Sequence, residues 1–197
     1  QQVPQDGRWR RKLAQVAEWT QHPQVAAQQW RAMFENGDRS PEAVSAVIRF
    51  APFMDNASLA LQAWQVRTQN STLTPAQWAD IFQLYESSAE PSTGSLFFEA
   101  QFRQKKLPLL LEYAAQMAEN AGEDARASDL YLQRTRLLPF SMDMLLRSVV
   151  SLVRRDKMRE AFELMHRHQA QVPADASEFL VLLGQVAWEQ GAYDSAQ

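Results

Sequence analysis

One period constrains this sequence more than any other feature. A small residue followed four positions later by a large apolar one recurs in two steps of 34 residues, with a gap of 67 between them. The clear copies are Ala26/Trp30, Ala60/Trp64, Ala127/Tyr131 and Ala161/Met165, and Ala196 opens a further one. A third copy is expected at Thr93/Phe97 or Gly94/Phe98, where the repeat is either degenerate or one residue short. Such a period indicates stacked helical hairpins that bury their apolar faces against one another.

Residues that favour helix starts and turns follow the same register. Gly122, Asp156 and Gly191 each lie five residues before the small residue of a copy, where a turn is expected. Ser40-Pro41 and Thr74-Pro75 place a capping hydroxyl before a proline, which favours a helix start. These signals predict units that begin near residues 7, 41, 74, 108, 142 and 177.

Two further local features concern helix boundaries. Asp175 with Glu178 resembles a capping box before the last expected helix. Ser, Pro and Gly cluster between Glu86 and Ser95, which predicts a longer loop between helices.

The units resemble tetratricopeptide repeats (TPRs). The match is most specific from Glu178 to Ala196, at Leu180, Leu183, Gly184, Ala187, Gly191, Tyr193 and Ala196. The first unit retains Leu13, Ala14, Ala17, Ala26 and Trp30. The resemblance implies an all-α, right-handed superhelical solenoid of antiparallel helix pairs, with about five and a half repeats. We expect residues 1–197 to form one such array, cut from a longer protein, because neither end supplies a polar capping repeat.

Composition excludes several classes of protein. The chain is 46% hydrophobic and 22% charged, and no apolar run approaches the length that spans a bilayer. A formal net charge of −3 argues against a nucleic-acid-binding surface, which is usually basic. The absence of cysteine excludes disulfides and thiolate chemistry.

No catalytic pattern is evident, so we predict neither enzymatic activity nor a cofactor. The sequence has no glycine-rich phosphate loop, serine nucleophile elbow or HExxH pattern. His166 and His168, two residues apart on an expected helix, point to different sides, which disfavours a metal site. His22 is interpreted as a residue of a solvated turn.

Resemblance to TPR arrays implies that the first helix of each pair lines a concave groove. The positions that flank the buried stripe give the predicted partner-binding set: Arg8, Arg11, Trp19, Arg49, Phe53, Glu112, Tyr113, Gln116, Arg147, Arg154 and Trp188. Lys12, Asn120, Gln185 and Glu189 flank the same stripe. Aromatic side chains with charges beside them suit a protein segment or a polar polymer.

Two considerations limit this prediction. Trp19, Phe53 and Trp188 could instead pack against adjacent helices. The carboxylate-clamp arrangement by which some TPR proteins hold a peptide C-terminus is not evident in the groove positions.

The first unit carries a further resemblance. Its helix Arg11-Lys12-Leu13-Ala14-Gln15-Val16-Ala17-Glu18-Trp19, followed by Gln28-Gln29-Trp30, resembles the periplasmic repeat regions of bacterial exopolysaccharide export proteins of the Pel type. That resemblance implies a periplasmic TPR array of a biofilm-polymer exporter, attached to an outer-membrane barrel outside this sequence. Its partners would be a polysaccharide deacetylase or hydrolase and the polymer itself.

Two alternatives stay open at this point. The chain could be a cytoplasmic TPR adaptor or regulator that binds a peptide. It could also be the superhelical arm of an enzyme such as a lytic transglycosylase, whose catalytic domain would lie elsewhere.

Overall fold

The structure is a computed structural model that describes residues 7–54, 56–189 and 191. The described residues form helices and connecting turns, without a β-strand. The chain divides into two compact units, Gln1–Ala89 and Glu90–Gln197. We describe each unit by itself, so a single continuous array over residues 1–197 stays a prediction.

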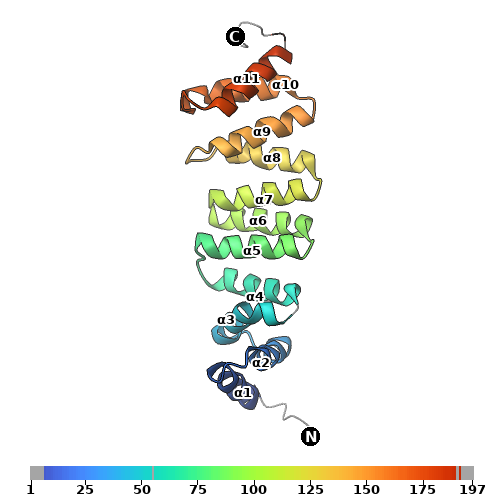
Figure 1. Cartoon of the computed structure of the whole chain (residues 1–197), viewed down its shortest axis with the longest axis vertical. Helices are drawn as coiled ribbons and strands as arrows, with labels where there is room; N and C mark the ends of the chain where they lie inside the picture. The colour runs from blue at the N-terminus through green and yellow to red at the C-terminus, as the bar shows by residue number, and fades with distance from the viewer. Residues whose placement is uncertain (1–6, 55, 190, 192–197) are drawn as a thin grey trace. The chain divides into compact units, whose positions relative to one another are not determined.

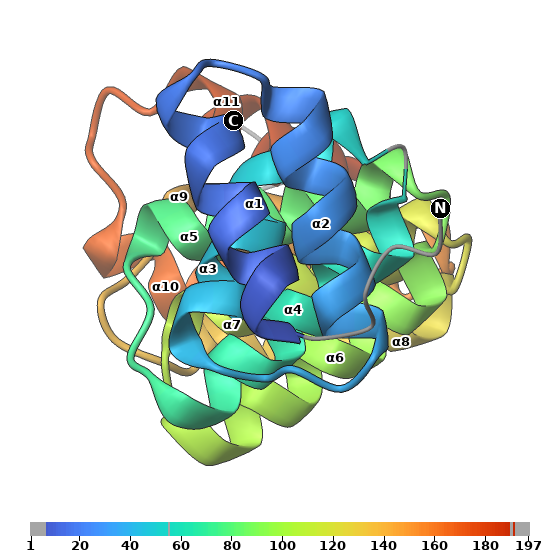
Figure 2. The same cartoon turned by 90° about the horizontal axis from the view of Figure 1, so that it is seen from below.

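The described residues of the first unit form five α-helices. They are α1 (Gly7–Trp19), α2 (Pro23–Glu35), α3 (Pro41–Phe50), α4 (Ala57–Asn70) and α5 (Pro75–Ser87), with a 3-10 turn at Ala51–Phe53. Each helix packs against the next one in the chain (Figure 1). The view in Figure 2 looks onto α1 and α2, which lie side by side.

The described residues of the second unit form six α-helices in the same sequential arrangement. They are α6 (Pro91–Lys105), α7 (Pro108–Asn120), α8 (Asp124–Thr135), α9 (Met142–Arg154), α10 (Met158–His168) and α11 (Ser177–Glu189), with a 3-10 turn at Gln169–Gln171. Consecutive helices of this unit also pack against one another.

Small residues and large apolar ones alternate in both cores, as the period requires. In the first unit Ala26 and Ala60 are buried, and so are Trp30 and Trp64. Ala127 with Tyr131 and Ala161 with Met165 are buried in the second. Alanine lets the neighbouring helix approach closely, and the large side chain fills the space one turn away.

The uncertain third copy is Gly94/Phe98. Both residues are buried, whereas Thr93 is exposed. Next to Gly94, the Ser95 hydroxyl donates a buried hydrogen bond of 2.7 Å to the Ala114 carbonyl, which ties α6 to α7. The Ala196 copy, together with Tyr193, lies outside the described residues.

Helix starts follow the local signals closely. The Ser40 hydroxyl accepts a hydrogen bond from the Ala43 amide, and Thr74 forms a full capping box with Gln77. Gly122, Asp156 and Gly191 have positive φ angles, so the predicted turn residues do adopt the left-handed conformation.

Two boundary predictions were wrong. No long loop covers 86–95, because α5 extends to Ser87 and Pro91 begins α6 in the first-turn position that proline favours. Asp175 does not cap the last helix, because that helix begins at Ser177 and Asp175 lies in the preceding turn. Leu13 and Leu180, which match the repeat pattern, are largely exposed on α1 and α11.

Candidate functional site

The predicted groove residues of the first unit fall on α1, α3 and the turn that follows α3. Arg8 and Arg11 line one depression on α1. Trp19 is 81% exposed at the end of α1, so the interpretation that it packs against adjacent helices is wrong. Phe53 is half-exposed, with its ring centroid 6.3 Å from that of Phe50.

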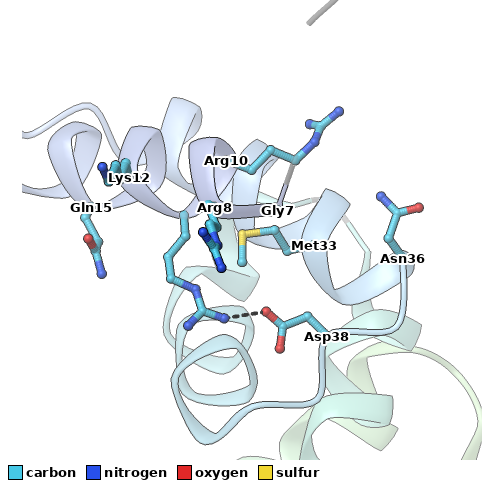
Figure 3. A pocket seen from close by; sticks show the side chains of 9 residues that line it. Gly7, Arg8, Arg10, Lys12, Gln15, Met33, Asn36 and Asp38 are labelled. Atoms are coloured by element: carbon cyan, nitrogen blue, oxygen red, sulfur yellow. Dashed lines mark hydrogen bonds and ion pairs between the residues drawn. The ribbon is translucent and has the colours of Figure 1, made fainter. Parts of the chain in front are cut away.

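A depression lies beside α1. Its volume is about 880 Å³, and its described lining residues are Gly7, Arg8, Arg10, Arg11, Lys12, Gln15, Met33, Asn36 and Asp38 (Figure 3). Four of these side chains are cationic and one is a carboxylate. Cavities of this size accommodate small ligands or peptide segments.

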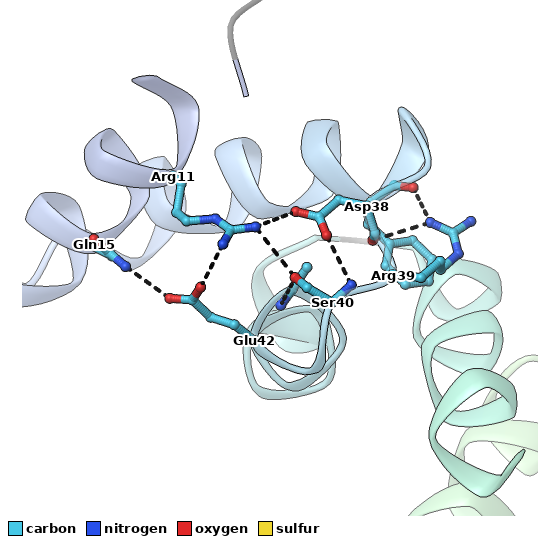
Figure 4. Close-up of polar contacts among 8 residues, drawn as sticks. Arg11, Gln15, Asp38, Arg39, Ser40 and Glu42 are labelled. Carbon is cyan, nitrogen blue, oxygen red and sulfur yellow. Dashed lines mark hydrogen bonds and ion pairs between the residues drawn. The ribbon is translucent and has the colours of Figure 1, made fainter. Parts of the chain in front are cut away.

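One side of the depression is an ordered polar network (Figure 4). Arg11 contacts Asp38 at 2.8 Å and Glu42 at 3.3 Å, and Gln15 donates to Glu42 at 2.8 Å. Partial burial alone would raise the pKa of Asp38, but hydrogen bonds from Ser40 and the Arg11 charge outweigh it and lower that pKa. This network holds α1 against the start of α3, so Arg11 has a structural role.

Two other cations of the depression, Arg10 and Lys12, lack such partners within the described part of the chain. Arg10 donates to the neutral Gln29 side chain at 3.3 Å, and the Lys12 ammonium lies 5.9 Å from the Trp9 ring centroid. No carboxylate of the described residues forms an ion pair with either cation. The depression therefore presents positive charge to solvent.

Arg49 lies on α3 and takes part in a different contact. Its guanidinium contacts Glu18 at 2.6 Å, and the other oxygen of Glu18 accepts a hydrogen bond from the buried Trp30 indole at 2.6 Å. Glu18 therefore links α1, α2 and α3. The sequence interpretation omitted Glu18 from the predicted site.

Glu119 repeats this arrangement in the second unit. The Tyr131 hydroxyl donates to Glu119 at 2.7 Å, and Arg154 and Arg147 contact the same carboxylate at 3.2 Å and 3.6 Å. The structure thus brings the predicted residues Arg147 and Arg154 together on a carboxylate that the prediction omitted. Burial, followed by the Glu119 hydrogen bond, raises the pKa of Tyr131.

The remaining predicted residues of the second unit are mostly engaged within the fold. Glu112 contacts Arg134 at 2.6 Å, and Arg134, with a side chain only 4% exposed, also donates to two carbonyls of the link after α8. Tyr113 packs edge-on against Phe98 at 5.3 Å, and burial followed by the Glu112 charge raises its pKa. Gln116 is half-buried.

Trp188 on α11 is 66% exposed. The binding role of the whole predicted set stays a prediction.

The histidines do not assemble into a metal site. The described residues contain no group of three His, Asp or Glu side chains placed to hold a metal ion. His166 lies edge-on to Phe162, and the buried His168 stacks on Phe140. His22 lies in the turn before α2, next to Thr20. None of the described helices has the length and apolar character to cross a membrane.

Comparison with known proteins identifies the fold. The sequence matches no family model and no curated protein. Among solved structures, the MamA protein aligns with a TM-score of 0.51 and 7% identity, over 97% of this chain and 97% of that one. YrrB, described as a TPR protein with an unusual peptide-binding site, aligns with a TM-score of 0.50 and 9% identity, over 91% of this chain and 88% of that one. YrrB is described as a TPR protein, and both alignments cover most of this chain, so the chain has the fold of an all-α helical-repeat solenoid.

Proposed function

We propose that this chain is a protein-interaction scaffold whose α1 surface binds an acidic segment of a partner protein. The observation that carries the proposal is the charge of the α1 depression of about 880 Å³, whose described lining holds the cations Arg8, Arg10, Arg11 and Lys12 and one carboxylate. A partner with Asp and Glu side chains would supply the opposite charge, which favours fast and correctly oriented association.

The neighbouring aromatic side chains support a protein partner over a small anion. Trp9 and Trp19 are both largely exposed on α1. Tryptophan and arginine are the residues that contribute most to protein interfaces, because they bury large areas and orient the partner. The likeness in fold to YrrB is consistent with a peptide as the bound segment.

The test is a binding titration with a dye-labelled acidic peptide, followed by fluorescence anisotropy. We expect Arg10→Gln with Lys12→Gln to weaken binding roughly tenfold, and added salt to weaken it further. Neither side chain forms an ion pair with a described residue, so the double variant is expected to stay folded.

The matched control removes two charges of the same unit outside the depression. Arg31 pairs with Glu35 on α2, and Arg67 lies over the Trp64 ring on α4. The variant Arg31→Gln with Arg67→Gln is expected to bind the peptide as the unchanged chain does. Equal weakening by both pairs would mean that net charge alone governs binding and would reject the α1 site.

The physiological setting rests on the sequence resemblance of the first unit. We propose a periplasmic scaffold of a Pel-like exopolysaccharide export system that docks a polysaccharide deacetylase or hydrolase and guides the polymer. A pull-down from a periplasmic extract, with the unchanged chain and the Arg10/Lys12 variant as baits, tests this setting. A polysaccharide-modifying enzyme captured only by the unchanged chain supports it, and capture of none contradicts it.

A further inference from the structure

The arginines of the second unit divide into two groups. Nine arginines follow Glu90 in the sequence, and seven of them form ion pairs with Asp or Glu. The other two, Arg136 and Arg167, are exposed and have no carboxylate partner among the described residues. Both line the same small pocket.

This pocket lies where α8, α10 and the link after α8 meet. Its volume is about 260 Å³, and Leu132, Leu137, Phe140 and Leu164 contribute apolar side chains to its lining. Leu138, also in the lining, is 82% exposed. Because the volume is below the usual range for drug-sized ligands, the pocket has room for about one large side chain.

Taken singly, each of the two arginines has a simple physical reason for its position. Arg136 is the C-cap residue of α8, and Arg167 lies in the last turn of α10, where a cation is stabilised by the helix dipole. That preference accounts for a positive charge at each helix end. It does not account for two guanidinium groups, both without a described carboxylate partner, at one small pocket whose lining is partly apolar.

His168 adds an independent observation. It is buried, lines the same pocket and stacks on Phe140, and its Nδ1 has no hydrogen-bond partner among the described residues. A buried polar atom without a partner is costly, so a ligand that supplies a hydrogen-bonding group at this point would be favoured.

We propose that this pocket binds the C-terminal residue of a partner polypeptide. An apolar side chain such as leucine enters the cavity, and the terminal carboxylate contacts Arg136 and Arg167. A single terminal residue then supplies both the apolar side chain and the carboxylate, as the small volume requires. Its peptide group also offers a hydrogen-bonding partner of the kind that His168 Nδ1 lacks. The site lies on the second helices of the pairs and in a link, apart from the groove positions on the first helices.

The first experiment compares dye-labelled tetrapeptides that end in leucine as the free acid or as the amide, by fluorescence anisotropy with the full chain. The acid is expected to bind at least about tenfold more tightly than the amide, because only the acid carries the charge that guanidinium groups recognise. Equal affinities of acid and amide, or no binding of either, would overturn the proposal.

Variants locate the site. Arg136→Gln with Arg167→Gln is expected to remove the preference for the acid, whereas Arg103→Gln with Arg159→Gln is the matched control. The control arginines are exposed, belong to the same unit and pair with Glu99 and Glu163 away from the pocket. Leu138→Asp changes an exposed side chain, so the fold should tolerate it, and it should also weaken binding of the acid.

A competition measurement and a variant distinguish a polypeptide terminus in this pocket from a simple fatty acid and from a peptide bound at α1. Hexanoate offers a carboxylate and an apolar chain without a peptide group, and displacement of the peptide by hexanoate at equal concentration would reject a polypeptide ligand. The Arg10/Lys12 variant of the α1 surface should bind the leucine peptide normally. Loss of binding in that variant would show that the peptide binds at α1 instead.

Discussion

Glu18 in α1 and Glu119 in α7 occupy the same position in repeats of the two units. Each lies twelve residues before the aromatic side chain that donates to it, and each contacts an arginine of the next first helix. They differ in their partners, because Glu18 accepts from an indole and pairs with one arginine, whereas Glu119 accepts from a phenol and contacts two. The shared requirement is thus an acceptor for a buried aromatic donor, while the surface cations vary.

The largest effect should follow from removing the aromatic side chains themselves. Trp30 and Tyr131 are each 1% exposed, so truncation to alanine should lower the free energy of unfolding by about 3–5 kcal/mol in either unit. Urea unfolding followed by circular dichroism measures this. Trp19→Ala, on the exposed Trp19, should stay within about 0.5 kcal/mol, and a similar loss there would mean that aromatic burial does not explain the effect.

Removal of the Glu18 or Glu119 carboxylate should lower the stability by different amounts. Glu18→Ala and Glu119→Ala should each cost about 1–3 kcal/mol, with the larger loss at Glu18. An indole N–H can only donate, so Trp30 is left without a partner, whereas the Tyr131 hydroxyl can also accept a hydrogen bond from Arg147. The same unfolding experiment on Glu18→Gln and Glu119→Gln, which keep an acceptor, should show smaller losses. A larger loss at Glu119 would contradict this account.

Alkaline pH should weaken the second site specifically. The raised pKa of Tyr131 means that the folded state holds the phenolic proton more tightly than the unfolded chain. This stabilisation is complete below the ordinary pKa of 10.0 and is lost as the pH rises toward the pKa of the folded state. Unfolding of the unchanged chain and of Tyr131→Phe, compared between about pH 8 and pH 11, should show the steeper loss in the unchanged chain. The pKa of Tyr113 is also raised, and Tyr113 is present in both proteins, so it contributes the same loss of stability to each. Equal losses of stability in the unchanged chain and in Tyr131→Phe would therefore contradict the assignment to Tyr131.

The smallest effects should come from the arginines. Arg49→Ala and Arg154→Ala remove ion pairs whose arginine side chains are more than half exposed, so each should cost less than about 1 kcal/mol. Urea unfolding at low and high salt measures the difference, which should shrink as salt screens the charges. A cost that persists in high salt would point to packing of the arginine stem.

The fold could be predicted because its cause is local and repeated. The alternation of alanine with large apolar residues, and prolines at helix starts, are visible without any knowledge of contacts. The loop expected over 86–95 was wrong for an equally local reason. Pro91, Thr93 and Gly94 are typical of loops when read singly, but proline also favours the first turn of a helix, and a buried glycine allows close helix packing.

The candidate sites were harder to predict, because charge neutralisation depends on contacts between successive repeats. The arginines of the groove were identified from their helix face, but the partner of Arg49 lies on α1 and that of Arg154 on α7. The register could have revealed Glu18 and Glu119, since both precede the small residue of their repeat by eight positions. Arg136 and Arg167 lie outside the groove pattern, so no periodic signal marks their pocket.

Within each unit, every helix packs against its neighbours in the chain, and this determines how far the stabilisation by a bound ligand extends. In such an array stability is a sum of repeat terms and nearest-neighbour terms, so the effect of an added ligand decays with each interface it crosses. A segment bound on α1 should therefore slow amide hydrogen exchange strongly in α1 and α2 and progressively less in α3 and α4. In such an array a bound ligand stabilises mainly the repeats next to it, so separate repeats can bind separate ligands with little interference.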